Sequence, residues 1–165
     1  MLVDKHNDYR ARHWGTRPLC YADIKSPDVE FKAQEWADFL KENKEFYHMP
    51  KPRAFGEKMA KDSYEGEPDM IKLAGAAVDR WYSEESRWNY EEGKSNDGLI
   101  VHFTQTVWKT SKLMNCGFTW YQPDGERKQF IMVCQYWPRG NAADKAVWGD
   151  YVGGKKDVCE VGELS

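Results

Sequence analysis

Residues 116–134, CGFTWYQPDGERKQFIMVC, carry the strongest structural signal in this chain. Two apolar runs flank the turn sequence PDGE, which predicts two antiparallel strands joined by a tight turn. Gly125 is the midpoint between Cys116 and Cys134, so a hairpin centred there places the two cysteines opposite each other. Directly opposed residues lie within reach of a disulfide. We therefore predict a Cys116–Cys134 disulfide, with two buried free thiols as the alternative in a reducing compartment.

The other two cysteines, Cys20 and Cys159, lie near the two ends of the chain. They could form a second bridge, but four cysteines allow three pairings and the sequence alone does not choose between them. Met1 leads directly into the polar run LVDKHNDYRARHW, which does not resemble a signal peptide. This start fits either a cytosolic protein or a secreted one that has lost its leader. The predicted disulfide favours secretion, so we expect an extracellular protein.

Length and composition narrow the classes of protein to consider. A chain of 165 residues fits one domain, here predicted over 1–165 with 142–165 as its loop-rich tail. The 24 basic and 27 acidic residues give a net charge of -3, which argues against a nucleic-acid partner. The apolar runs are too short to span a membrane. With 8 Trp, 9 Tyr and 7 Phe, the core should be rich in aromatic rings.

The rest of the chain predicts a mixture of helices and strands. We expect a helix over 2–13, a second helix starting at Ser26 and Pro27, and a short strand near residue 55. A third helix is predicted over 68–88, followed by a polar loop and a short helix near His102. Apolar residues recur at helical spacing along the third helix, at Ile71, Ala74, Val78, Trp81 and Tyr82.

Five sequence blocks carry a resemblance to a known family. HFTQTVWKTS (102–111) resembles the first signature of the CAP superfamily, which includes cysteine-rich secretory proteins, antigen five allergens and plant pathogenesis-related class one proteins. IMVCQYWPRGN (131–141) is similar to its second signature. HNDYRARH (6–13), FGEKMA (55–60) and AVDRWYSEE (77–85) resemble further family elements, in the same order. The resemblance implies an α+β fold, a three-layer α-β-α sandwich with a small antiparallel sheet.

The resemblance also implies a cleft that holds two histidines and two glutamates. By motif these are Glu57, Glu84 and His102, and His48 is the candidate for the fourth position because it precedes FGEKMA. Two neutral imidazoles can ligate zinc or another divalent cation, with the carboxylates in support. Without metal, the same groups can form His–Glu pairs. We expect no obligatory cofactor, with zinc or a similar cation as an optional ligand and these four residues as the site if the protein is an enzyme.

Several neighbouring residues receive a structural interpretation. Lys58 replaces an Asn of the family pattern, and on a strand it should point away from Glu57. Glu85 lies about 100° around the helix from Glu84, so only one of the two should face the cleft. His6 and His13 match neither histidine position of the cleft, and we expect surface or structural roles for them.

The family resemblance implies binding of sterols or fatty acids, in a groove between helices and at a loop before the first signature. The matching loop here is RWNYEEGKSNDGLIV (87–101), whose apolar side chains are Trp88, Tyr90, Leu99 and Ile100. Such side chains on a polar loop can fold over a sterol. The alternative is a plain surface loop with Trp88 in the core.

Two other functions compete with a lipid carrier. A metal-dependent hydrolase would rely on a metal-activated water, because no HExxH motif occurs and no Ser or Thr nucleophile is placed by motif. A secreted effector would act through a protein receptor. Only one cysteine follows WPRGN, so the Cys-rich domain of channel-acting relatives is not expected. The sequence does not give the oligomeric state.

Overall fold

The computed structural model describes residues 2–23, 25–26, 29–142 and 144–156. The helices are α1 (Leu2–Arg10), α2 (Ala33–Asn43), α3 (Met70–Ser83), η1 (Glu84–Arg87), α4 (Val101–Thr106), η2 (Lys145–Val147) and α5 (Trp148–Tyr151). The strands are β1 (Cys20–Tyr21), β2 (Lys25–Ser26), β3 (Val29–Glu30), β4 (Gly56–Tyr64), β5 (Trp88–Asn89), β6 (Lys94–Ser95), β7 (Leu113–Tyr121) and β8 (Lys128–Trp137).

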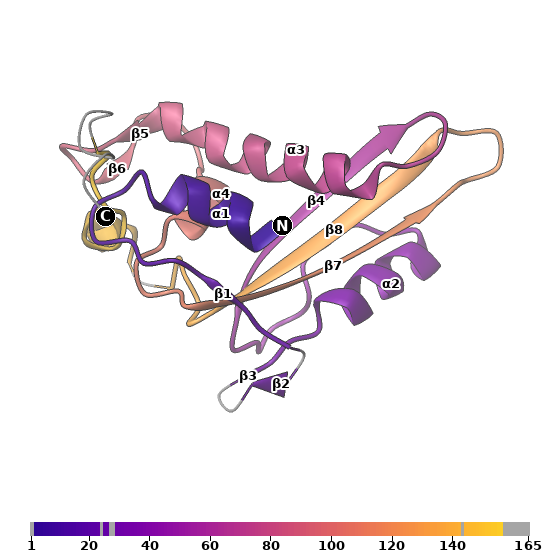
Figure 1. Cartoon of the computed structure of the whole chain (residues 1–165), viewed down its shortest axis with the longest axis horizontal. Coiled ribbons are helices and arrows are strands. Elements are labelled where there is room, and N and C mark those ends of the chain that lie inside the picture. Colours follow the sequence, from indigo (N-terminus) through magenta and orange to yellow (C-terminus); the bar gives the residue numbers. More distant parts are fainter. Residues whose placement is uncertain (1, 24, 27–28, 143, 157–165) are drawn as a thin grey trace.

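The helices cover both faces of a four-stranded sheet with the order β1-β7-β8-β4 (Figure 1). Helices α1 and α3 pack on one face, and α2 packs on the other. The long strands β7, β8 and β4 pair antiparallel, and β1 adds a short parallel pairing to β7. The expected α+β three-layer sandwich is therefore confirmed.

Strand β8 is buried on both faces, which explains its nearly continuous apolar sequence. Phe130, Met132 and Cys134 alternate with Ile131 and Val133, and all five are 0% exposed. The first three pack with α3, and the other two pack with α2. Because successive side chains of a strand point to opposite faces, β8 supplies both halves of the core.

The predicted hairpin and its disulfide are confirmed. Cys116 pairs directly with Cys134 in the register of β7 and β8, and a disulfide joins them. Gly125 adopts a positive φ of 70° in the connecting turn, a conformation that glycine takes at little cost. Cys20 is exposed and forms no disulfide within the described residues. Cys159 lies outside those residues, so the pairing of Cys20 with Cys159, which the sequence left open, is not tested.

The second helix starts later than predicted, at Ala33 instead of near Ser26. Ser26 belongs to β2 and pairs with Val29 of β3. Val29 and Phe31 are both buried in a cluster with Phe55. This spacing of two matches an extended chain, and burial of these two side chains outweighs the helix-start signal.

Other predicted boundaries also shift. The first helix ends at Arg10 and not at residue 13. The third helix ends at Ser83 and continues as the 3-10 helix η1. The strand predicted near residue 55 is β4, nine residues long and paired along its whole length with β8. Strand β4 is this long because it pairs with β8, and the local sequence of β4 does not reveal that partner.

The segment 144–156 packs against the body of the domain. Trp148 of α5 is 6% exposed and meets the ring of Trp108 edge-on, with 5.9 Å between ring centroids. Val152 forms an isolated β-bridge with Trp108. Within the described residues, no helix is long and apolar enough to cross a membrane.

Replacing both Cys116 and Cys134 with Ala is expected to lower the free energy of unfolding by about 3 kcal/mol, because the disulfide closes a loop in the unfolded chain. Denaturant unfolding of the purified variant measures this loss. Cys20→Ser is the matched control and should leave the midpoint unchanged, since Cys20 is exposed and bonds to no other described cysteine. An unchanged midpoint in the double variant would contradict the prediction.

Candidate functional site

Glu84 connects the end of α3 to the start of α4. Its Oε2 accepts hydrogen bonds from the backbone amides of His102 and Phe103, each at 3.0 Å. Its Oε1 lies 2.8 Å from Nδ1 of His102. Because a carboxylate accepts, Nδ1 carries a hydrogen, and in the neutral ring Nε2 holds the lone pair. Glu84 thus orients the imidazole and sets its tautomer.

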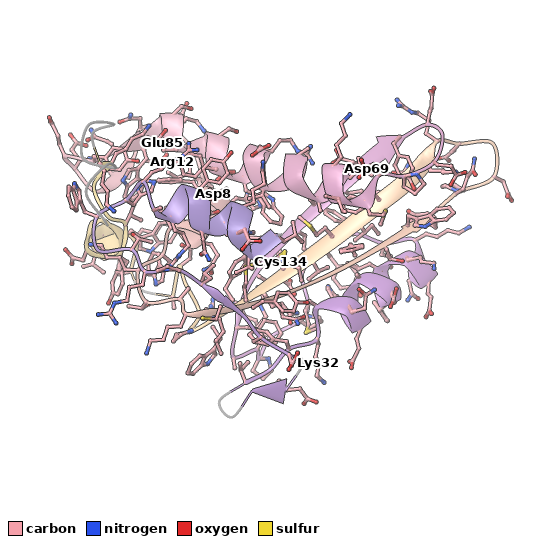
Figure 2. The ribbon with its side chains drawn as sticks, viewed as in Figure 1. Asp8, Arg12, Lys32, Asp69, Glu85 and Cys134 are labelled. Atoms are coloured by element: carbon pink, nitrogen blue, oxygen red, sulfur yellow. A yellow bond between two sulfur atoms is a disulfide. The ribbon has the colours of Figure 1, made fainter. Side chains whose placement is uncertain are left out.

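The same contacts keep Glu84 ionised. Burial raises the pKa of Glu84, but the hydrogen bonds from the His102 ring and from the Phe103 and His102 amides outweigh burial and leave the pKa below its usual value. Glu85 instead accepts from the Tyr90 hydroxyl at 2.9 Å and pairs with Lys155. Glu85 lies at the η1 end of α3, well away from Cys134 on β8 (Figure 2). The expectation that only one of the two glutamates faces His102 is confirmed.

Glu57 forms a second pair, with His48. Glu57 Oε1 lies 2.8 Å from His48 Nδ1 and accepts from the Met49 amide at 2.9 Å, while Oε2 accepts from Gln135 at 3.2 Å. The Glu57 side chain is 0% exposed and that of His48 is 53% exposed. Burial raises the pKa of Glu57, but the hydrogen bonds from His48, Met49 and Gln135, with help from Arg53, leave it lowered.

The four residues that the sequence predicted therefore form two hydrogen-bonded pairs from four different elements. Gln135, which holds Glu57, also accepts from the Lys32 amide at the start of α2, whereas Glu84 and His102 lie beside α3 and α4. In the part of the chain that the structure describes, no three His, Cys, Asp or Glu side chains are placed to hold a metal ion. Assembly of both pairs around one ligand stays a prediction.

A cleft of about 300 Å³ lies beside His102 and is lined by Phe46, Met59, Ala60, Lys61, Arg80, Trp81, Glu84 and His102. Its rear wall is the indole of Trp81, which stacks on the His102 ring with centroids 6.1 Å apart. Arg80 on the rim pairs with Asp62. Sequence reasoning missed Phe46, which stands 43% exposed in a loop and whose only signal was an aromatic residue in a polar run.

Lys58 points away from Glu57, as expected from strand alternation. Its side chain is buried, and Nζ lies 2.6 Å from Thr106 Oγ1 and 3.5 Å from the His102 carbonyl. The amine also lies 4.2 Å from the centre of the Trp81 ring. Burial lowers the pKa of Lys58 well below its usual value, although Glu84 counters this in part. Lys58 thus contacts the His102 carbonyl and the Trp81 ring, and both of these residues line the cleft.

The loop residues predicted to bind lipid divide into two groups. Trp88 and Ile100 are 5% and 1% exposed and belong to a core cluster with Phe103. Tyr90 is half-buried and bonded to Glu85, whereas Leu99 is 54% exposed. A cavity of about 210 Å³ lies under the loop, lined by Trp88, Lys94, Ser95, Gly98, Leu99, Ile100, Lys145 and Trp148.

A wider groove, of about 440 Å³, separates α1 from α3. It is lined by Leu2, Lys5, Ile71, Lys72, Gly75, Ala76 and Asp79. Ile71 is 58% exposed, unlike the other four residues of the apolar stripe of the third helix, which are buried. The reason is that α1 and α3 leave this space between them, and Ile71 lines it instead of the sheet. The sequence implied a groove between helices but did not identify these residues.

The family comparison agrees with the fold. The chain belongs to the CAP family, the cysteine-rich secretory protein family, whose model matches residues 3–136. Human Golgi-associated plant pathogenesis-related protein 1 is 28% identical over 153 residues, covering 92% of this chain and 89% of that protein. Human cysteine-rich secretory protein 3 is 27% identical over 148 residues, and the match spans 87% of this chain but only 57% of that relative.

Solved structures share the fold. The Schistosoma mansoni venom allergen-like protein 4 (SmVAL4) is 17% identical with a TM-score of 0.63, covering 96% of this chain and 95% of that one. A structure titled NaASP2 with Zn2+ is 20% identical with a TM-score of 0.63, covering 99% and 93%. At such low identity, these likenesses establish the fold alone.

Replacing Glu84 with Gln is expected to destabilise the protein by about 1–2 kcal/mol at pH 7, because the carboxylate holds two amides and one imidazole. The pKa of Glu84 is lowered in the folded state, so its contribution is present above the unfolded pKa of about 4.3 and is lost as pH falls through the folded pKa. Unfolding measured from pH 7 to pH 3 should show wild type and variant converging. The exposed Glu91→Gln is the control, and a constant difference at all pH values would count against this role.

Proposed function

We propose that this CAP domain binds a fatty acid in the groove between α1 and α3. The observation that carries the proposal is the groove itself, a space of about 440 Å³ with an exposed isoleucine in its wall. This volume falls within the range of about 300–1,000 Å³ that is usual for small-molecule sites.

The side chains of the groove suit an acyl chain with a charged head group. Gly75 and Ala76 are small, so one turn of α3 leaves room beside Ile71 for a hydrocarbon chain. Each buried methylene contributes about 0.8 kcal/mol. Lys5 and Lys72 supply positive charge for a carboxylate, and Lys5 is held in place by its 2.8 Å ion pair with Asp79.

A second proposed ligand is a sterol at the loop of residues 87–101. Support comes from the cavity under the loop, whose lining includes Trp88, Leu99 and Ile100. Its volume of about 210 Å³ lies below the usual range for such ligands, so the loop would have to open before a sterol entered. Since Trp88 and Ile100 are core residues, Leu99 is the side chain free to contact the ligand first.

We also propose that the protein works outside the cell, in an oxidising environment. The Cys116–Cys134 disulfide supports this, because such bonds persist in secreted proteins and are rare in the cytosol. The relatives' names point both ways, since one is called secretory and another Golgi-associated.

A divalent cation such as zinc is proposed as an optional ligand of His48 and His102. In each ring Nδ1 is engaged by a glutamate, so Nε2 is the nitrogen available for a metal. Two imidazoles without a third protein ligand would leave water to complete the coordination, which fits weak binding and not a structural zinc site. The metal would supply a Lewis acid in the cleft.

Replacing Ala76 with Phe is expected to weaken fatty-acid binding about tenfold or more, because the ring would occupy the space proposed for the acyl chain. Titration with a fluorescent fatty acid measures the affinity. Ala11→Phe, which adds the same ring at an exposed position just beyond α1, is the matched control and should bind like wild type. Equal affinity of all three proteins would rule out the groove as the site.

A sterol titration in parallel separates the two proposed ligands. Leu99→Ser should weaken sterol binding and leave fatty-acid binding unchanged, whereas Ala76→Phe should do the reverse. Val147→Ser, which removes another exposed apolar side chain near the loop, is the control. Sterol binding that is unaffected by Leu99→Ser would remove the loop from the proposal.

Zinc binding should be lost when His48 and His102 are both replaced with Ala, because these rings are the proposed donors. Zinc requires neutral imidazoles, so the wild-type affinity should be lower at acidic pH than at neutral pH. Isothermal titration calorimetry with zinc alone tests both statements. Zinc binding that survives in the double variant would show that the metal sits elsewhere.

A further inference from the structure

Two buried histidines fasten the first helix and the residues after it to the rest of the domain. His6 and His13 are each 0% exposed, and each has both ring nitrogens hydrogen-bonded. His6 contacts β8 and α3 through Tyr136 and Trp81. His13 contacts α3 through Tyr82. The expected structural role of both residues is confirmed, and neither faces the cleft beside His102.

The hydrogen bonds fix each ring in one neutral tautomer. His6 Nδ1 lies 2.8 Å from the Leu2 carbonyl, which can only accept, so Nδ1 carries the hydrogen. His6 Nε2 must then accept from the Tyr136 hydroxyl, at 2.8 Å. His13 repeats the pattern, with Nδ1 donating to the Gly153 carbonyl and Nε2 accepting from the Tyr82 hydroxyl, each at 3.0 Å.

A second proton does not fit this arrangement. A protonated ring would present an N–H to the tyrosine oxygen, and the tyrosine hydroxyl would have to turn its own hydrogen elsewhere. Among the described residues, neither the Tyr136 nor the Tyr82 hydroxyl has a second hydrogen-bond partner. Protonation would therefore bury an unpaired donor as well as a charge, and both are costly in the interior.

The charged groups around His6 oppose protonation further. Lys58 on β4 and Arg10 on α1 both face it, and Tyr136 on β8 is the remaining titratable neighbour. Burial, followed by the charge of Lys58, holds the pKa of His6 well below its usual value.

The surroundings of His13 are mixed. Arg10 and Lys155 are positive, Glu85 on η1 is negative, and Tyr82 and Tyr90 are neutral. Burial lowers the pKa of His13, while the Gly153 carbonyl and Glu85 counter that effect in part. Of the two histidines, His6 thus carries the greater penalty on protonation.

The position of these histidines connects them to the groove. The Leu2 residue whose carbonyl accepts from His6 also lines the α1–α3 groove. The Asp79 carboxylate in the groove does not titrate near neutral pH. Burial raises the pKa of Asp79, but Lys5 and Tyr9 outweigh burial and leave the pKa lowered. Any loosening of the groove between neutral and mildly acidic pH would therefore come from the histidines.

We propose that His6 and His13 form an acid-sensitive latch, which holds α1 and the residues after it against β8 and α3 at neutral pH and loosens them on acidification, so that a ligand in the groove is released. The release step rests on the proposed fatty-acid site, whereas the loosening of α1 does not. The folded state binds fewer protons than the unfolded chain below pH about 6.5, so stability contributed by the neutral rings is complete above that pH and declines below it.

Hydrogen exchange on the ligand-free chain tests the latch directly. Protection factors of α1 amides, corrected for intrinsic exchange, should fall about tenfold or more between pH 7.5 and pH 5, while those of β8 stay high. Replacing both His6 and His13 with Gln should remove most of this fall. Unchanged α1 protection in wild type, or the same fall in the double variant, would overturn the proposal.

Lys58→Met provides a second test that keeps both histidines. Removing the neighbouring positive charge raises the pKa of His6 toward its usual value, so the acid-induced loss of α1 protection should become smaller. This variant decides the matter if the double glutamine variant does not fold. A loss as large as in wild type would contradict the role assigned to His6.

Ligand release is measured separately with a pyrene-labelled alkyl sulfonate, whose head group stays charged across this range. Its affinity should fall about tenfold from pH 7.5 to pH 5 in wild type and much less in the glutamine variant. If the probe binds with a pH-independent affinity, the latch fails while the groove stands. If no probe binds but α1 still loosens, the proposed ligand site fails while the latch stands.

Discussion

Strand β8 is the element on which the rest of the structure depends. It is hydrogen-bonded along both edges, to β7 and to β4, and its side chains are buried on both faces. Helices on opposite faces of the sheet each pack on β8, through Cys134 on one side and Val133 on the other. A strand that is paired along both edges and buried on both faces can carry a polar side chain only where that side chain finds hydrogen-bond partners. Gln135 finds them in Glu57 and Lys32.

The same principle shapes the two histidine–glutamate pairs. Glu57 and Glu84 are partly or fully removed from solvent. An imidazole and one backbone amide stabilise the Glu57 anion, and an imidazole and two backbone amides stabilise that of Glu84. A carboxylate that accepts several hydrogen bonds costs less to bury than one that faces a single partner. The pairs are therefore fixed before any ligand arrives. In each pair the glutamate engages Nδ1 and leaves Nε2 as the nitrogen for the proposed metal ion.

The face of the sheet that carries α1 and α3 has a different character. Its interface includes buried bases that are not paired with carboxylates by hydrogen bonds. The Arg10 guanidinium donates to four carbonyls, those of Arg17, Thr106, Trp108 and Ser111, and Lys58 donates to a threonine hydroxyl. Arg10, together with His6 and His13, makes the attachment of α1 and the residues after it specific, because this segment fits only where its hydrogen-bond partners lie. The groove between α1 and α3 meets this interface at Leu2, which lines the groove and whose carbonyl bonds His6, and this contact links the two in the proposed release mechanism.

The sequence by itself determined the hairpin, because the alternation of apolar residues and the central turn fix which residues face each other across β7 and β8. It also indicated the family and the glutamates at 57 and 84, since each lies within a continuous block of neighbouring residues. Tertiary structure decided what depends on distant partners. Val29 and Phe31 are extended because they pack against Phe55. Ile71 is exposed because it lines the groove between α1 and α3. Trp88 and Ile100 belong to the core because they pack in one cluster with Phe103. The roles of His6 and His13 likewise depend on hydroxyls 130 and 69 residues away in sequence. Local periodicity reports which side of an element is apolar, but only packing shows what covers that side.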